Sequence, residues 1–330
     1  MIIDCHVHFA GIDGVGGYIS RKFKWSPSFL MMRHFTGHLF KKIDTQAVLN
    51  HLLETLNRAE KVDRAVFLAL DEVYDAEGNP SAQGTHLHAA NDFVAGLARD
   101  HEKVLFGASV NPNRKDALDE LDRVAEMGAV LVKWLPSAQG IDCADTRFVP
   151  FYRKLADLGL PLLPHVGAEH TIPVAWGRRD MKDLNHPARL ELPLDQGVKV
   201  VAAHCCLPVF WWDPNHSAEF LSLMLSYRNL YADVSAMTLP SGFRARTIKR
   251  MVGEFPPDRL LFGSDYPIPV NPSLRGWKGE QRERIKRAKA VANPMDRNLE
   301  LLLAMGFSEQ MFATTRQVLR LPAEPAPAEA

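Results

Sequence analysis

The chain contains 330 residues, and its 39 lysines and arginines balance its 39 aspartates and glutamates, so the formal net charge is zero. This balance argues against a protein that holds nucleic acid or an anionic membrane mainly by bulk electrostatic attraction. Hydrophobic residues make up 46% of the chain and charged residues 24%, which is typical of a globular protein and excludes extensive disorder.

Eight short runs rich in apolar and β-branched residues recur along the chain. They cover residues 2–5, 65–70, 104–110, 130–134, 161–164, 199–203, 230–234 and 260–262. Most of these runs are almost continuously apolar and do not alternate with polar residues. Because this pattern is typical of parallel strands that are covered on both faces, we predict eight parallel strands.

Segments with helical periodicity lie between these runs. The expected helices cover 45–61, 87–100, 114–128, 148–159 and 218–227. In the first of them Val48, Leu52 and Leu56 recur at the spacing of one helix face. This alternation of strands and helices favours a closed (β/α)8 TIM barrel over an open doubly wound sheet. No GxGxxG or Walker-type loop follows a strand, which also weakens a nucleotide-binding fold.

A barrel of this kind needs about 250 residues, so part of the chain lies outside it. We predict one barrel domain over 1–320, with an inserted excursion at 10–44 and a disordered Pro/Ala/Glu-rich tail at 321–330. The excursion combines aromatic residues and methionines with basic residues, and as a lid it would cover the barrel mouth. A homodimer contact and a solvated loop explain the same composition, and both stay open.

The sequence predicts a cytoplasmic protein without a membrane span. No uncharged apolar run approaches the roughly 18 residues that a transmembrane helix needs, and no signal peptide is recognised. The longest apolar candidate, 200–212, contains His204 and Pro208. None of the four cysteines forms a CxxC pair, so neither a disulfide framework nor a cysteine zinc site is indicated.

Two histidines close the first predicted strand. His6 and His8 are two positions apart, so they share a strand face and form a ready pair of metal ligands on the inner rim of a barrel. Such a pair alone often occurs by chance, and a surface or core histidine is the commoner explanation. The same alternation predicts that Cys5 faces outward, against a helix.

Further polar residues end other predicted strands. Lys133 ends the fourth, His165 the fifth and His204 the sixth, while Asp265 follows the eighth. In a barrel the carboxyl ends of all strands converge on one mouth, so these side chains are expected to meet there. Since a barrel core tolerates charge poorly unless it is paired or metal-bound, their recurrence indicates a metal site.

The motifs around these residues resemble those of the amidohydrolase superfamily, and more closely its amidohydrolase-related branch, which includes the aminocarboxymuconate-semialdehyde decarboxylase-like proteins. The matching segments are IIDCHVHF (2–9), VLVKWLP (130–136), LLPHVG (162–167), VVAAHC (200–205) and LLFGSDYP (260–267). As a set they are highly specific for the superfamily, but they do not name a substrate.

The resemblance implies a role for each residue. His6, His8, His165 and Asp265 would bind a divalent metal. His204 would polarise the substrate or help to hold the attacking water, and Asp265 would also take the proton from that water. Asp233 and Ser235, at the end of the seventh strand, share a face and would contact the ligands from outside the metal site.

Lys133 decides how many metal ions are expected. In binuclear members of the superfamily a lysine at this place is carboxylated and bridges two metals. The amidohydrolase-related branch usually uses one, so one ion is favoured, with an unmodified Lys133 paired to a substrate carboxylate or to Glu169. Zinc is the first choice, while manganese and iron suit the same histidine and carboxylate ligands.

Three functions remain as hypotheses, each with a small-molecule partner. The first is a hydrolase in which metal-activated water attacks an amide, lactone or ester of a small acidic or aromatic substrate. The second is a non-oxidative decarboxylase of an aromatic or unsaturated acid, and the third is a non-catalytic ligand-binding barrel. The decarboxylase-like proteins resemble HxHxxP at the first strand, whereas Phe9, Ala10 and Gly11 follow His8 here, so hydrolysis is favoured.

Overall fold

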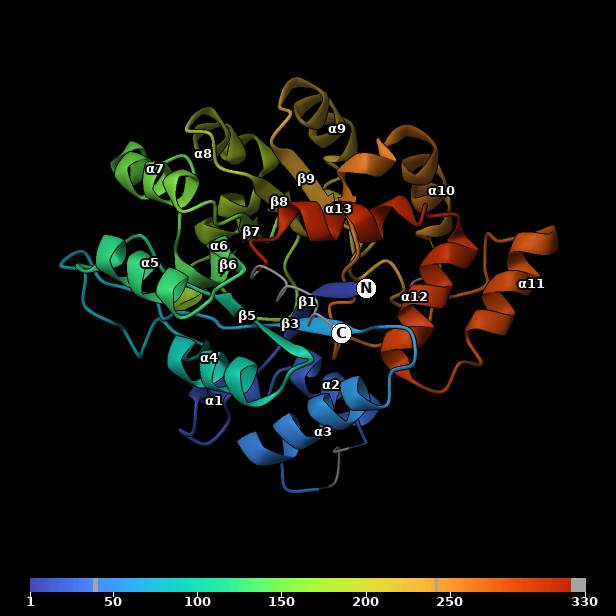
Figure 1. The fold of residues 1–330 in the computed structure, drawn as a ribbon, viewed down its shortest axis with the longest axis horizontal. Coiled ribbons are helices and arrows are strands. Elements are labelled where there is room, and N and C mark those ends of the chain that lie inside the picture. The colour runs from blue at the N-terminus through green and yellow to red at the C-terminus, as the bar shows by residue number, and fades with distance from the viewer. Residues whose placement is uncertain (38–40, 241–242, 322–330) are drawn as a thin grey trace, which may run out of the picture.

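The computed structural model describes residues 1–37, 41–240 and 243–321. Of the predicted tail, 321–330, all residues after Leu321 lie outside the described part of the chain. Eight strands form one sheet in which every neighbouring pair is parallel. In sheet order they are β1 (Ile3–His8), β3 (Arg64–Leu68), β5 (Val104–Ala108), β6 (Leu131–Trp134), β7 (Leu162–Pro164), β8 (Val200–Ala202), β9 (Leu230–Asp233) and β10 (Leu260–Leu261). The helices surround these strands as an outer ring (Figure 1), which confirms the predicted (β/α)8 TIM barrel.

The barrel closes through the segment that follows β10. β10 itself has two residues, but the chain beyond it runs alongside β1. Cys5 N–H donates to Phe262 O at 3.0 Å, and His8 N–H donates to Tyr266 O at 2.8 Å. In the opposite direction, Asp265 N–H donates to His6 O at 2.8 Å. This seam therefore joins the first strand to the last part of the barrel.

The first strand contains a β-bulge that corrects one expectation. Asp4 pairs with Ala65 and Val7 pairs with Phe67, so Cys5 and His6 together oppose one residue of β3. Cys5 packs in the same cluster as Leu131, which shares the inner face of β6 with Lys133. The prediction that Cys5 faces outward was therefore wrong, because the bulge interrupts the alternation on which it rested.

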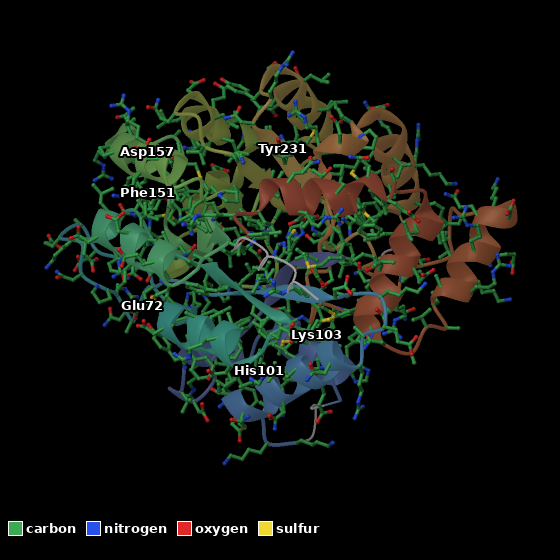
Figure 2. The ribbon with its side chains drawn as sticks, viewed as in Figure 1. Glu72, His101, Lys103, Phe151, Asp157 and Tyr231 are labelled. Atoms are coloured by element: carbon green, nitrogen blue, oxygen red, sulfur yellow. The ribbon has the colours of Figure 1, made fainter. Side chains whose placement is uncertain are left out.

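Five predicted helices can be compared with the structure. Four are confirmed within a few residues, as α3 (Thr45–Asn57), α5 (Ala117–Glu126), α7 (Val149–Asp157) and α9 (Ser217–Ser226). The fifth, expected over 87–100, begins only at α4 (Asn91–Asp100). On α7, Phe151 packs against Trp134 of β6 with ring centroids 5.5 Å apart, while Asp157 is exposed on the outer ring (Figure 2).

The excursion forms its own small elements. They are β2 (Gly17–Ile19), α1 (Arg21–Lys24) and α2 (Pro27–Phe35). β2 pairs in antiparallel fashion with β4 (Leu87–Ala89), which explains why the predicted helix at 87–100 starts late. The side-chain hydroxyls of Ser20 and Ser26 cap the first turns of α1 and α2. The part of the excursion from Gly17 to Phe35 is thus folded, and its strand β2 pairs with β4 from the chain after β3.

The remaining helices complete the ring and the barrel base. They are α6 (Pro136–Gln139), α8 (Glu191–Asp195), α10 (Ala245–Glu254), α11 (Gly279–Ala288), α12 (Pro294–Met305) and α13 (Gln310–Val318), with 3₁₀ segments η1 (Thr146–Phe148), η2 (Ala175–Gly177), η3 (Arg179–Asn185), η4 (Pro187–Leu190), η5 (Ala203–Cys206) and η6 (Pro257–Arg259). Val318 and Leu319 join the inner cluster that contains Ile3 and Leu131, so the end of α13 closes the barrel opposite the predicted mouth (Figure 1). None of the described helices combines the length and apolar character that crossing a membrane requires.

Candidate metal centre and reaction cavity

The structure gathers the predicted polar residues at the carboxyl ends of the strands. His6 and His8 lie on β1 and Lys133 lies on β6, while His165 follows β7 directly. His204 lies in η5 after β8, and Asp265 follows β10. All of these residues are buried except His8, which is partly exposed. Their common end of the barrel is the one where residues from different strands can act on a single ligand.

Three of these side chains meet at one point. His6 Nε2 and His8 Nε2 are 3.2 Å apart, and Asp265 Oδ1 lies 3.0 Å from His8 Nε2 and 3.4 Å from His6 Nε2. His204 Nε2 lies 4.0 Å from the other oxygen of Asp265. Nitrogen and oxygen donors so close together are the ligand set that divalent zinc, manganese and iron accept.

Asp233 fixes the protonation of the buried imidazole of His6. Its Oδ2 lies 2.7 Å from His6 Nδ1, and a carboxylate can only accept, so the proton of His6 is on Nδ1. Burial, followed by the positive charge of Lys133, lowers the pKa of His6 well below its usual value. His6 is therefore neutral, and its unprotonated Nε2 faces His8 Nε2 and Asp265 Oδ1.

The same carboxylate orients His204 through a serine. Ser235 Oγ donates to Asp233 Oδ1 and therefore accepts a hydrogen bond from His204 Nδ1–H, at 2.7 Å. Burial, followed by His165, lowers the pKa of His204 well below its usual value, so His204 is also neutral with a bare Nε2. The predicted contact of Asp233 and Ser235 with the histidines is present, and the donor chemistry fits a divalent cation.

Replacing Asp233 with asparagine is expected to weaken Zn²⁺ affinity about 10- to 100-fold, because the amide holds the His6 tautomer less firmly. Competition with a chromophoric chelator measures this affinity. Asp296→Asn is the matched control, since Asp296 is equally buried but accepts the backbone N–H groups of Glu60 and Lys61 away from the site. Unchanged Zn²⁺ affinity in the Asp233 variant would contradict this function of the carboxylate.

Lys133 is fully buried beside the histidines. Its Nζ lies 3.1 Å from His6 Nε2, and the side chain has no exposed surface. Burial lowers its pKa to about 8, an effect that the negative charges of Asp233 and Asp265 oppose. Burial therefore favours the neutral amine form of Lys133 more than it does for a lysine in water.

His165 lies next to the cluster but makes different contacts. Its ring packs edge-on against His204, with centroids 4.9 Å apart. Its Nε2 contacts Ala168 O at 3.3 Å, and its Nδ1 lies 3.4 Å from Glu169 Oε2. Burial alone would raise the pKa of Glu169, but His165 and the backbone N–H groups of Ile172 and Thr171 lower it, so Glu169 is charged. The predicted ligand role of His165 stays a prediction.

The backbone is strained where it carries the site. His204, Cys205 and Asp265 have φ angles of 60°, 50° and 63°, in the left-handed region that favours glycine. Gly263 packs close to β1, because a Cβ there would lie 3.0 Å from His6 Cβ. Strain of this kind is costly and is concentrated at functional sites.

A cavity of about 450 Å³ opens beside the cluster. Its polar lining includes His8, His165, His204 and Asp265, and α2 of the excursion contributes Phe29, Met31 and Met32. Most other walls are apolar, including Leu207, Leu239 and Ile268. The volume and character suit a small organic molecule with an apolar body.

Sequence reasoning missed one charged residue of this cavity. Arg244 lines it and is 3% exposed, although it follows no predicted strand. The available signal is its spacing to Ile248 and Met251, buried residues of α10 that lie four and seven positions further on. An arginine on the buried stripe of a helix is unusual and points to a special environment.

Comparison with known proteins places this geometry among related folds. The family model described as amidohydrolase matches residues 3–295. An uncharacterised TIM-barrel protein from Bordetella bronchiseptica is 19% identical, with a TM-score of 0.56 and coverage of 92% of this chain and 99% of that chain. No curated protein matches the sequence.

Two further solved structures have the same fold. A putative 2-pyrone-4,6-dicarboxylic acid hydrolase from Pseudomonas putida is 17% identical, with a TM-score of 0.55 and coverage of 96% of each chain. A 5-carboxyvanillate decarboxylase from Sphingomonas paucimobilis is 14% identical, with a TM-score of 0.54 and coverage of 97% of this chain and 99% of that chain. At these identities the likeness concerns the fold alone.

Proposed function

Since the chain belongs to the amidohydrolase family, we propose that it is a metal-dependent hydrolase, in which activated water attacks an amide, lactone or ester of a small acidic or aromatic substrate. One observation carries this proposal. The unprotonated Nε2 of His6, together with His8 Nε2 and Asp265 Oδ1, forms a group of donors within 3.4 Å of one another at the base of an open cavity.

In this proposal His6, His8 and Asp265, joined by His165, hold one divalent ion. Zinc is the first choice, and manganese and iron are alternatives with the same ligand preferences. When bound, a cation such as zinc lowers the pKa of water to near ~7, which supplies hydroxide at neutral pH. Lys133 remains unmodified in the one-ion form.

Asp265 has two oxygens in different surroundings, which suits two tasks. Oδ1 faces the Nε2 atoms of His6 and His8, while Oδ2 faces His204. We assign to Asp265 the transfer of a proton from the attacking water to the leaving group. Because the bare Nε2 of His204 can accept but not donate a hydrogen bond, we assign to His204 the task of holding that water.

A non-oxidative decarboxylase is the second candidate, and the apolar walls of the cavity favour it. A carboxylate placed among Phe29, Leu207 and Leu239 loses hydration, which promotes its departure as CO₂ while a proton from water takes its place on the carbon. The 5-carboxyvanillate decarboxylase among the similar structures performs a reaction of this type, as its name states.

A substrate panel separates the two reactions. Lactones, amides, esters and carboxylated phenols are incubated with the zinc-loaded protein, and acid release is followed with a pH indicator while CO₂ is followed by a coupled assay. We expect acid release without CO₂ from at least one lactone, amide or ester. CO₂ from a carboxylated phenol, without hydrolysis of any panel member, would replace the hydrolase proposal by the decarboxylase.

A further inference from the structure

Arg244 is a buried cation whose hydrogen-bonding capacity is largely unmet. Its Nη1 donates to Ala236 O at 2.5 Å, and its Nη2 has only a weak acceptor, Met237 Sδ at 4.0 Å. Its Nε is buried and has no partner. Nε–H and Nη2–H together form one edge of the planar guanidinium, so this edge lacks a strong acceptor.

No carboxylate of the described residues forms an ion pair with Arg244 within 4.0 Å, and the charges of Asp213 and Asp265 act on it only from a greater distance. Arg114 illustrates the usual arrangement, because it pairs with both Asp71 and Asp116. Burial lowers the pKa of Arg244 to about 10, so the side chain remains charged at neutral pH. A charge in this position is costly unless another group provides acceptors.

The reaction cavity is the space from which such a group can come. Arg244 lines the cavity together with His204 and Asp265. Among the described residues that line the cavity, Arg244 is the one arginine or lysine. Lys133, the other cation near the cluster, is fully buried and does not border the cavity. Arg244 is therefore the one lysine or arginine of the described residues that a negatively charged ligand in the cavity would meet, in addition to the divalent ion proposed at His8 and Asp265.

We propose that Arg244 anchors a carboxylate of the substrate, and that the substrate is an organic acid with one carboxylate and an otherwise apolar body. The two parallel N–H groups of the Nε/Nη2 edge match the two oxygens of a carboxylate. One guanidinium balances one negative charge, and the apolar walls formed by Phe29, Leu207 and Leu239 accept the rest of the molecule. The inference rests on the proposed function, because it names the substrate class of the same cavity.

Benzoate and its neutral isostere benzamide are the probes, titrated into the zinc-loaded protein by calorimetry. We expect wild-type protein to bind benzoate at least about 30-fold more tightly than benzamide. The reason is that a hydrogen bond between charged groups contributes more free energy than a neutral one, by an amount that corresponds to this ratio of affinities. Arg244→Met should weaken benzoate binding about 30-fold and leave benzamide binding unchanged. Arg244→Lys should give an intermediate affinity, because it keeps the charge but loses the paired donors.

Arg297→Met is the matched control. Arg297 also has a buried Nε without a partner and donates to one backbone carbonyl, Val291 O, but it does not line the cavity. Its replacement should leave the benzoate affinity unchanged. This control separates loss of the anchor from a general effect of removing a poorly paired arginine.

Two results would overturn the inference. The first is equal affinity of wild-type protein for benzoate and benzamide, a measurement that needs no variant. The second is wild-type benzoate affinity in Arg244→Met or, if that variant does not fold, in Arg244→Lys. Failure of the proposed function is recognised separately, because protein that binds benzoate through Arg244 but takes up no metal would contradict the hydrolase and not the anchor.

Discussion

Replacing Asp265 with asparagine is expected to lower kcat about a thousandfold while the fold survives. Asparagine preserves the size of the side chain and its backbone N–H bond to His6 O, but it cannot take a proton from water at neutral pH. The measurement is kcat on the hydrolytic substrate from the panel, with the melting temperature and the zinc content determined on the same sample. Turnover at the wild-type level in this variant would exclude the mechanism.

Asp71→Asn is the control for that experiment. Asp71 is another buried aspartate, and it lies shortly after β3, but it accepts from Asn111 N–H and pairs with Arg114 and not with the histidines. Its replacement should lower stability, since it weakens a buried ion pair, and should leave kcat close to the wild-type value. A large loss of kcat in both variants would point to a general structural effect.

Removal of the divalent ion is expected to abolish turnover and to lower the melting temperature, with both restored by added Zn²⁺. A ligand that binds only the folded state stabilises it by about 4 kcal/mol at a thousandfold excess over Kd. Dialysis against a chelator, followed by thermal unfolding and activity measurements during Zn²⁺ titration, provides the result. Bound metal below about a tenth of an equivalent, without any thermal shift on addition of Zn²⁺ or Mn²⁺, would favour the non-catalytic binding barrel.

The same titration counts the ions. Saturation at one equivalent is expected, with Lys133 unmodified. Saturation at two equivalents, together with about 44 Da of added mass on the intact folded protein beyond the mass of the two ions, would indicate a carboxylated lysine and a binuclear centre.

The strands were predictable because burial on both faces leaves a direct trace in the sequence. All eight apolar runs are strands of the barrel, although several are shorter than the runs that predicted them. The prediction at 87–100 was wrong at its start because Leu87–Ala89 forms β4 by pairing with β2, which lies far earlier in the chain. Such a pairing leaves no periodicity within the segment itself.

The convergence of the polar residues was predictable for a geometric reason. Once His6, His204 and Asp265 are assigned to the carboxyl ends of barrel strands, the closed topology brings them together whatever their separation in sequence. The orientation of Cys5 was not predictable, because the bulge depends on how β1 meets β3. Arg244 caps the start of α10 and does not end a strand, so no strand pattern assigns it to the cavity.

The seam between β1 and the segment after β10 has a consequence for the synthesis of the protein. A nascent chain that ends before residue 260 already contains His6, His8 and His204, but it lacks Asp265 and the backbone partners that hold β1 in the closed barrel. The cluster of His6, His8 and Asp265 can therefore form only after the chain has been synthesised as far as Asp265. The pairing of β1 with the segment after β10 joins residues that are far apart in the sequence. Contacts of this kind form slowly during folding.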